Sequence, residues 1–311
     1  MENQMDTTKM NNRFDQAALI LRVGLGIVFV IGGMSKLSLL LGSATHDGMV
    51  ANYMGTAGYI NTIFQQFLFP NGTDGFFTPS GFLTALSAFE FFSGIALIAG
   101  FLVRPLALFY AFLMWTFVVS LPVLTVPGVE VTVNTYTSPA LFVQVRDIAL
   151  SGMFFTLFNL GSGLMSVDKR FVSQPKSINW DALGLLLRFS LAMVFIVAGF
   201  FGSFAKIATF GTWQPLLAVI GLLLIFGSDK VVRGAGIAVI AVMLWYMAQK
   251  LNMDKSIIAN LNGIKREFAL AGCGAALLML GGGSLFTMQD LISRSQRYIA
   301  EFRGSNNATA Q

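Results

Sequence analysis

The chain has 311 residues, of which 55% are hydrophobic and only 11% carry a charge. A soluble domain usually contains about 25% charged residues, so this chain has too few to cover a surface that meets water. The net charge of +5 comes from scattered basic residues that form no stripe, which argues against nucleic-acid binding. The composition predicts an integral membrane protein.

The counts of cysteine and histidine exclude several kinds of site. Cys273 and His46 are the only residues of their types, so an intramolecular disulfide, a Cys-x-x-Cys redox pair and a Cys/His zinc site are all excluded. A bis-histidine haem and an iron–sulfur cluster need more ligands than the chain contains. We therefore expect no haem, iron–sulfur cluster or metal, and any electron chemistry would need a mobile cofactor or a partner.

Apolar runs predict the membrane spans, each of which needs about 20 residues. Six runs are long enough, at 17–41, 82–101, 106–126, 141–160, 182–204 and 268–285. Two shorter runs, 213–226 and 235–248, reach only about 20 Å at ~1.5 Å per residue, so it is open whether they span fully. The predicted fold class is all-α, a polytopic membrane protein of about eight transmembrane helices.

The distribution of basic residues predicts the orientation. Segments 42–81 and 128–140 contain no Lys or Arg, whereas Lys9, Arg104 and Arg294 lie at the opposite ends of the spans. Short loops rich in Lys and Arg stay in the cytoplasm. We therefore expect both termini to be cytoplasmic and segment 42–81 to be outside, with the lysines of 249–266 as an exception.

Two segments outside the spans have an amphipathic pattern. Residues 51–68 can place Met54, Ile60 and Phe64 on one face of a helix along the membrane surface, either as a packed connection or as a lid. Beyond the last span, apolar residues alternate with arginines over 291–302. This second pattern predicts a helix at the cytoplasmic surface of the membrane.

Landmarks of the first half recur in the second half in the same order. Arg22, Phe29 and Gly33 have the spacing of Arg188, Phe195 and Gly199, and Arg146-Asp147 recurs as Arg266-Glu267. The pattern predicts two parallel four-helix bundles. The expected parts are a cytoplasmic segment at 1–16, a first bundle at 17–168 with its long outer loop 42–81, a cytoplasmic linker at 169–181, a degenerate second bundle at 182–290 and an amphipathic cytoplasmic segment at 291–311.

Some ionisable residues fall inside the predicted spans. Lys36, Glu90, Arg146 and Asp147 are expected in one layer, ~7–12 Å below the outer ends of three helices. They can form a buried ion-pair network that fixes helix packing. Alternatively, Lys36 and Arg146 hold an anion or a quinone carbonyl while Glu90 or Asp147 exchanges protons. Trp115 could then flank a ring-shaped ligand, although ordinary packing also explains it.

The second half repeats only part of this layer. It contains Lys206 and the Arg266-Glu267 pair, but its sixth span has no acid that corresponds to Glu90. A single site would therefore belong to the first half. Arg22 and Arg188, close to the inner ends of their helices, are expected to extend to the lipid headgroups.

Three ordered motifs carry a family resemblance. They are Arg22 with Gly32-Gly33-x-x-Lys36, then Glu90-Phe-Phe-Ser-Gly94-x-x-Leu97-Ile-x-Gly100 with Arg104, and Arg146-Asp147 with Gly161-x-Gly163-x-x-Ser166-x-Asp168. With these motifs the chain resembles the DoxX/DoxD family of bacterial and archaeal membrane proteins, over residues 17–170 above all. The long outer loop is similar to that of the DoxD branch, the large subunit of thiosulfate:quinone oxidoreductase.

This resemblance implies a subunit of a sulfur-compound:quinone oxidoreductase in a bacterial or archaeal cytoplasmic membrane. It implies an exchangeable membrane quinone and a separate DoxA-like small subunit. The sequence leaves the oligomeric state open, so a homo-oligomer is one alternative. Glu90 and Asp147 would be catalytic, and Lys36, Arg146 and Trp115 would bind the substrate or quinone. The alternatives are a non-enzymatic scaffold for redox or oxidative-stress proteins and, less favoured, a small-solute or lipid transporter.

Overall fold

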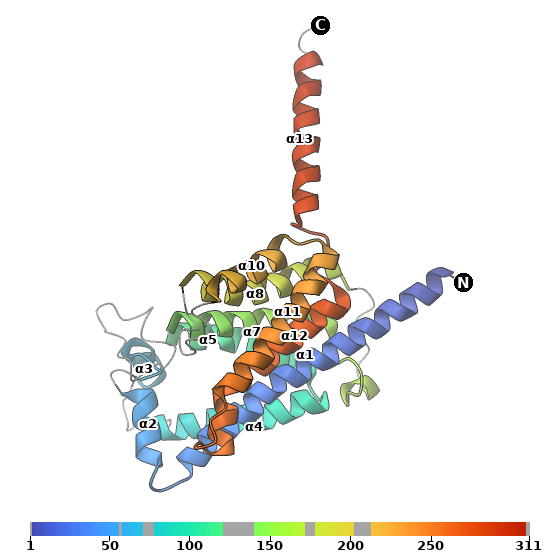
Figure 1. The fold of residues 1–311 in the computed structure, drawn as a ribbon. Helices are drawn as coiled ribbons and strands as arrows, with labels where there is room; N and C mark the ends of the chain where they lie inside the picture. Colours follow the sequence, from blue (N-terminus) through green and yellow to red (C-terminus); the bar gives the residue numbers. More distant parts are fainter. Residues whose placement is uncertain are drawn as a thin grey trace.

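The computed structural model describes residues 2–55, 58–70, 78–120, 140–171, 178–201 and 213–308, and these residues form helices and no β-strand. The long helices lie against one another in a single bundle (Figure 1). They are α1 (Glu2–Leu40), α4 (Pro79–Ala99), α5 (Val103–Ser120), α7 (Ala140–Leu160), α8 (Trp180–Phe201), α10 (Gln214–Phe226), α11 (Asp229–Lys250) and α12 (Ile257–Leu280). The predicted all-α class is confirmed.

Within the described residues, five of these helices are long and apolar enough to cross a membrane. They are α4, α5, α11 and parts of α1 and α8. α10 has only 13 residues, whereas α11 has 22 and is longer than the run 235–248 indicated. α7 and α12 are as long as the others, but both carry charged pairs. The chain is thus a polytopic membrane protein.

Several helices begin earlier than the apolar runs do. α1 begins at Glu2, inside the segment 1–16 that was expected to precede the first span. α12 begins at Ile257 rather than near residue 268, because the Ser256 side chain accepts a hydrogen bond from the Ala259 amide and caps the helix. The earlier start places Arg266 and Glu267 inside a helix.

The single surface helix predicted over 51–68 is wrong. The structure forms two short helices there, α2 (His46–Met54) and α3 (Thr62–Leu68). Gly55 ends α2 in an extended conformation, and the Asn61 side chain accepts a hydrogen bond from the Phe64 amide to start α3. Local capping therefore overrides the continuous apolar pattern.

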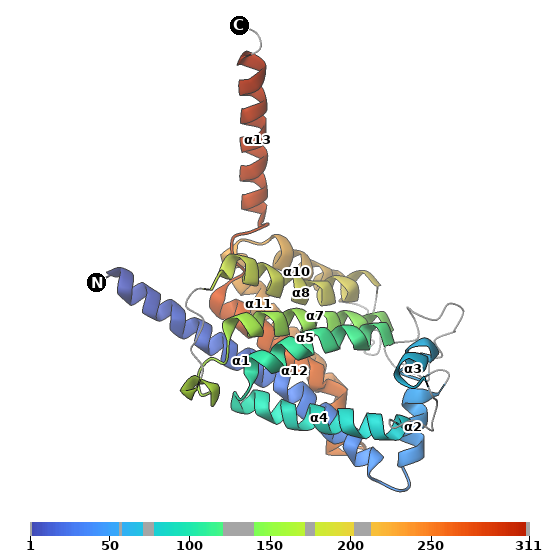
Figure 2. The same ribbon diagram turned by 180° about the vertical axis from the view of Figure 1, so that it is seen from behind.

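The contacts between helices follow the same order in both halves. α1 packs against α4 as α8 packs against α10, and α5 packs against α7 as α11 packs against α12. Two further contacts, α1 with α12 and α7 with α8, join the halves (Figures 1 and 2). Buried side chains of all these helices form one continuous apolar core. An ancestral duplication stays a prediction, but the two bundles are not separate bodies.

Glycines bring α1 and α4 close together. A side-chain carbon on Gly33 would stand 2.6 Å from the Phe91 amide nitrogen, and one on Gly94 would stand 2.7 Å from the Val30 amide nitrogen. Both distances are too short for real carbon contacts, so only glycine permits this approach. The close approach of the two helices at these glycines places Lys36 of α1 beside Glu90 of α4.

The expected headgroup contact of Arg22 and Arg188 is wrong, because both side chains are buried. Arg22 donates hydrogen bonds to the carbonyl oxygens of Leu97 (3.1 Å) and Leu164 (2.6 Å), and Arg188 donates to that of Ile225 (2.8 Å). The last carbonyls of a helix have no partner inside it, and a guanidinium has several donors in one plane. Each arginine therefore binds the end of α4 or α10.

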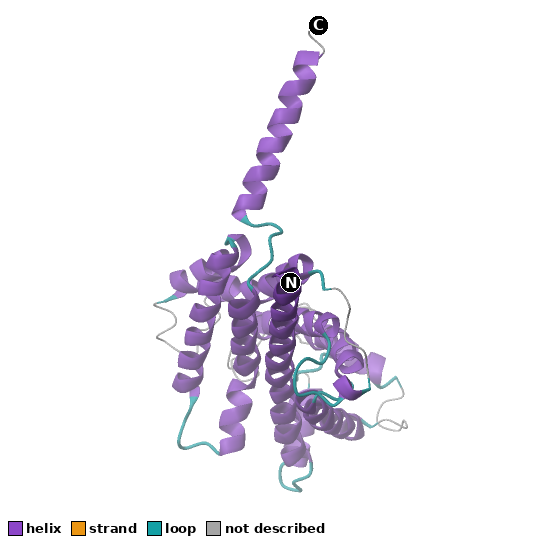
Figure 3. Ribbon diagram, turned by 90° about the vertical axis from the view of Figure 1, so that its right-hand side faces the viewer, coloured by secondary structure: helices purple, strands orange, loops and turns teal. Residues whose placement is uncertain are grey.

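The two ends of the bundle differ. We call the end that carries α2 and α3 the α2 end, and the opposite end, where the last helix begins, the α13 end. That last helix, α13 (Met288–Ala308), projects away from the bundle (Figure 3). Lys36, four residues before the end of α1, and Arg146, near the start of α7, lie toward the α2 end.

Candidate functional site

Three ion pairs connect the helices in the polar layer. The Lys36 ammonium lies 2.5 Å from Glu90 Oε2 and joins α1 to α4. The Glu90 carboxylate is buried, and the Lys36 side chain is nearly so. Burying an unpaired charge costs several kcal/mol, so each charge makes the other tolerable inside the bundle.

The other two ion pairs join α7 to α12 in a reciprocal exchange. Arg146 lies 2.5 Å from Glu267 Oε1, and Arg266 Nε lies 2.7 Å from Asp147 Oδ1. Each helix therefore contributes one cation and one carboxylate. The guanidinium of Arg266 also donates a second hydrogen bond, of 3.2 Å, to Asp147 Oδ2, so this pair is bidentate.

Lys265 adds a further cation to the layer. Its ammonium donates a 2.7 Å hydrogen bond to the Asn262 side chain, and none of the ion pairs between described residues includes it. A side-chain carbon on Gly32 would stand 3.1 Å from the Lys265 ammonium and 3.6 Å from Glu90 Oε2. Gly32 thus leaves room for the second lysine next to the Lys36–Glu90 pair.

Among the residues that the structure describes, the layer has more basic than acidic side chains. Its four basic residues are Lys36, Arg146, Lys265 and Arg266, and its three carboxylates are Glu90, Asp147 and Glu267. A low-dielectric surrounding screens the charges of such side chains poorly. The arrangement is therefore able to attract an anion or to polarise a carbonyl oxygen.

The three carboxylates differ in how fully they are bound. Both oxygens of Asp147 accept hydrogen bonds from Arg266. Glu267 is 1% exposed, and its Oε2 has no hydrogen-bond partner within the described part of the chain. A buried acceptor without a donor is costly and usually has a role. Glu267 Oε2 is therefore a buried oxygen to which a water or a ligand group is able to donate a hydrogen bond.

Aromatic side chains lie beside Glu90. Ser93, less than one turn further along α4, shares a 2.5 Å hydrogen bond with the Tyr110 hydroxyl. Tyr110 stacks on Phe154 with the ring centres 5.1 Å apart and also contacts Phe29. All three rings are buried. They form an apolar wall for the polar layer on the side of α1, α5 and α7.

The four charged residues singled out from the sequence all belong to these ion pairs, whereas Trp115 is not buried with them. Its side chain on α5 is 46% exposed. Buried Tyr110 has the aromatic position next to Glu90 instead. Lys206 lies outside the described residues.

A single site in the first half stays a prediction, but two charged residues of that half bind partners in the second half. The layer is completed by three residues of the second half, Lys265, Arg266 and Glu267. In the sequence, the recurrence of Arg146-Asp147 as Arg266-Glu267 was the feature that pointed to them. That recurrence did not predict that the cation of each helix pairs with the carboxylate of the other, α7 with α12. The absence of an acid corresponding to Glu90 does not exclude the second half, since its charges serve the shared layer.

Comparison with known proteins identifies the first part of this arrangement. Residues 17–121 match the DoxX family. No curated protein and no solved structure matches the chain. The matched region includes Arg22, Lys36 and Glu90, so it covers the α1–α4 side of the polar layer. This membrane protein contains a DoxX domain at residues 17–121.

Proposed function

We propose that this chain is the membrane subunit of a quinone-linked oxidoreductase that oxidises a reduced sulfur compound, such as thiosulfate, at the α2 end. The observation that carries the proposal is a polar layer that has, among the described residues, one more basic side chain than carboxylates and one buried carboxylate oxygen without a donor. Electrons leave the sulfur anion, and the quinone takes up electrons and protons to become the quinol. Such a reaction needs cations for the anion and a group that exchanges protons.

The proposal gives the charged residues separate roles. Lys36, Lys265 and Arg146 would hold the anion or the quinone carbonyl. Glu267 would exchange the proton, together with Glu90, because Asp147 is held on both oxygens by Arg266. The α2 end would face the outside, with both termini in the cytoplasm. A DoxA-like small subunit would complete the enzyme, and a second copy of the chain is another partner of this proposal.

The test is quinone reduction in membranes that contain this chain and its small subunit, with thiosulfate and related sulfur compounds as donors. Lys265→Gln removes the additional basic side chain, and Lys255→Gln is its matched control, since Lys255 is exposed in the segment before α12. We expect donor-dependent reduction that Lys265→Gln abolishes and Lys255→Gln preserves. Equal rates of quinone reduction in the two variants would show that the polar layer takes no part in the reaction.

A second function has its own support. All three carboxylates of the layer already make ion pairs with side chains of this chain, which is the arrangement expected of a network that fixes helix packing. In that case the protein is a non-enzymatic scaffold for redox or oxidative-stress proteins. Copurification with a stable partner, combined with no quinone reduction by any donor, would favour this function.

A further inference from the structure

The last helix, α13, presents an apolar face that no part of the described chain covers. Its apolar residues Met288, Leu291, Ile292, Tyr298 and Ile299 are related by spacings of three, four and seven positions. This spacing places them on one side of the helix. Ile292 is 50% exposed and Ile299 is 48% exposed. A face of this kind is stable only if something apolar meets it.

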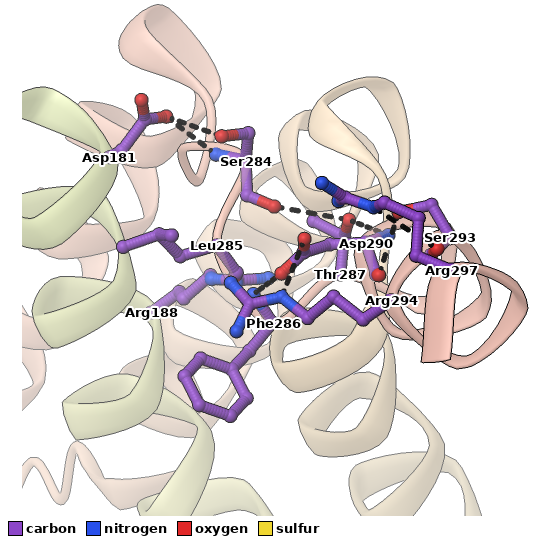
Figure 4. A network of polar contacts seen from close by, with 10 residues as sticks. All are labelled: Asp181, Arg188, Ser284, Leu285, Phe286, Thr287, Asp290, Ser293, Arg294 and Arg297. Carbon is purple, nitrogen blue, oxygen red and sulfur yellow. Dashed lines mark hydrogen bonds and ion pairs between the residues drawn. The ribbon is translucent and has the colours of Figure 1, made fainter. Parts of the chain in front are cut away.

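The beginning of α13 is held to the start of α8. Asp181 Oδ1 accepts hydrogen bonds from the Ser284 amide (2.8 Å) and hydroxyl (2.9 Å), and the buried Arg188 donates to the Leu285 carbonyl (Figure 4). Trp180, next to Asp181, begins a candidate membrane span. Because α13 starts at the level where α8 enters the membrane, its first turns lie at the bilayer surface.

A second group of contacts fixes the direction in which α13 leaves the bundle. Asp290 Oδ2 accepts a 2.9 Å hydrogen bond from the Phe286 amide, and Asp290 Oδ1 accepts one of 2.9 Å from Arg294 (Figure 4). Thr287 Oγ1 accepts from the Asp290 amide and caps the new helix. α13 then runs crosswise to α8 and α10 (Figures 1 and 2). This is the direction of a helix along the membrane surface, not across it.

We infer that α13 lies in the headgroup layer of the bilayer and inserts its apolar face among the lipid chains. The polar residues of the helix include Arg294, Arg297 and Arg303 against Asp290 and Glu301, so one positive charge is left for anionic headgroups. A helix with this composition is buried ~5–10 Å into the boundary between headgroups and acyl chains. The lipid surface fits better than a soluble partner, because the helix starts at the membrane level.

The experiment compares the two faces of α13 in the full chain, reconstituted in nanodiscs of phosphatidylcholine and phosphatidylglycerol. A fluorescent label is attached at Ile292→Cys on the apolar face or at Ala300→Cys on the polar side of the helix, both exposed in the structure. Cys273 is buried, and the unmodified chain serves as the labelling control. Quenchers are doxyl-labelled lipid in the bilayer and iodide in the water.

We expect doxyl lipid to quench the label at position 292 several-fold more than the label at position 300, and iodide to show the reverse order. Replacing phosphatidylglycerol by phosphatidylcholine should weaken the lipid quenching at 292. Equal iodide quenching at both positions would overturn the inference, because α13 would then project into water. Protection of position 292 from both quenchers would also overturn it and would assign the face to a protein partner or a second copy.

Discussion

Asp147 and Glu267 have corresponding positions in the two halves, yet their carboxylates are bound differently. Asp147 receives two hydrogen bonds from Arg266, whereas Glu267 keeps one oxygen without a donor among the described residues. At the scale of single residues, both carboxylates hold α7 to α12, and under the proposed function the oxygen of Glu267 without a donor is the one that exchanges a proton.

Glu267→Gln should therefore lower the rate of quinone reduction per folded protein, beyond any loss of folded protein caused by leaving the buried Arg146 without its charged partner. Loss of a group that transfers protons lowers a rate by roughly 10²- to 10⁴-fold. The measurement is the rate of donor-dependent quinone reduction at several pH values. Asp147→Asn should instead lower the yield of folded protein, because it leaves Arg266 without its charged partner. A Glu267→Gln variant with the wild-type rate and pH profile would contradict the proton role.

A second residue-scale prediction concerns the junction before α13. The hydrogen bond from Arg294, together with the one from the Phe286 amide, lowers the pKa of Asp290 below its ordinary value. A lowered pKa in the folded state stabilises the junction above the unfolded pKa, and this contribution disappears as pH falls through the folded pKa. By NMR, the Asp290 carboxyl should titrate below the ordinary range of an aspartate. Arg294→Gln should raise that midpoint, and an unchanged midpoint would contradict the assignment.

At the scale of elements, the packing of α1 on α4 depends on glycine at the contact. A methyl group at Gly33 would stand 2.6 Å from the amide nitrogen of Phe91 and the carbonyl oxygen of Ser87. Backbone atoms cannot move aside as the end of a flexible side chain can. The position of the Lys36–Glu90 ion pair therefore depends on a glycine three residues away.

Gly33→Ala should destabilise the protein by about 1–3 kcal/mol, the usual cost of overpacking. Thermal unfolding in detergent measures this as a lower midpoint. Gly263→Ala in α12 is the matched control, since an added methyl group there meets nothing within 4 Å. The control should be neutral or slightly stabilising, because alanine favours the helix by up to ~1 kcal/mol over glycine. Equal effects of the two substitutions would contradict the close contact.

At the scale of the whole molecule, the two halves form one body because charges as well as apolar side chains cross between them. α1 packs on α12 and α7 packs on α8, and the reciprocal ion pairs join α7 to α12. The chain is therefore expected to unfold as one unit. This prediction concerns both halves, although the DoxX match ends at residue 121.

A double-mutant cycle tests the connection between the halves. Arg146→Met alone should cost about 3–5 kcal/mol, because it leaves the buried Glu267 carboxylate without its ion-pair partner. Combining it with Glu267→Leu should restore most of that stability, since an apolar pair of similar volume replaces both charges. Thermal unfolding of the single and double variants measures the coupling. Additive effects would show that the pair does not connect the halves.

Much of the fold was predictable because lipid restricts the options of a chain. A segment in hydrocarbon must satisfy its backbone groups internally, so apolar runs of sufficient length predict helices, and the runs match the long helices of the structure. The boundaries were less predictable. α12 begins before its apolar run, because a serine caps its start. Its three charged residues are tolerated inside the bundle because neighbouring helices supply partners. Local caps also separate α2 from α3, although one apolar pattern runs through both.

The composition and the spacing of residues by themselves determined that this chain is an all-α membrane protein, that its halves carry the same landmarks, and that Lys36, Glu90, Arg146 and Asp147 share a level. Only the tertiary structure decided which charges are partners. Arg146 and Asp147 bind across the halves to Glu267 and Arg266, and Arg22 is turned into the bundle. The physical reason is that depth along a helix follows from residue number at a fixed rise, whereas partners depend on how the helices are rotated and packed.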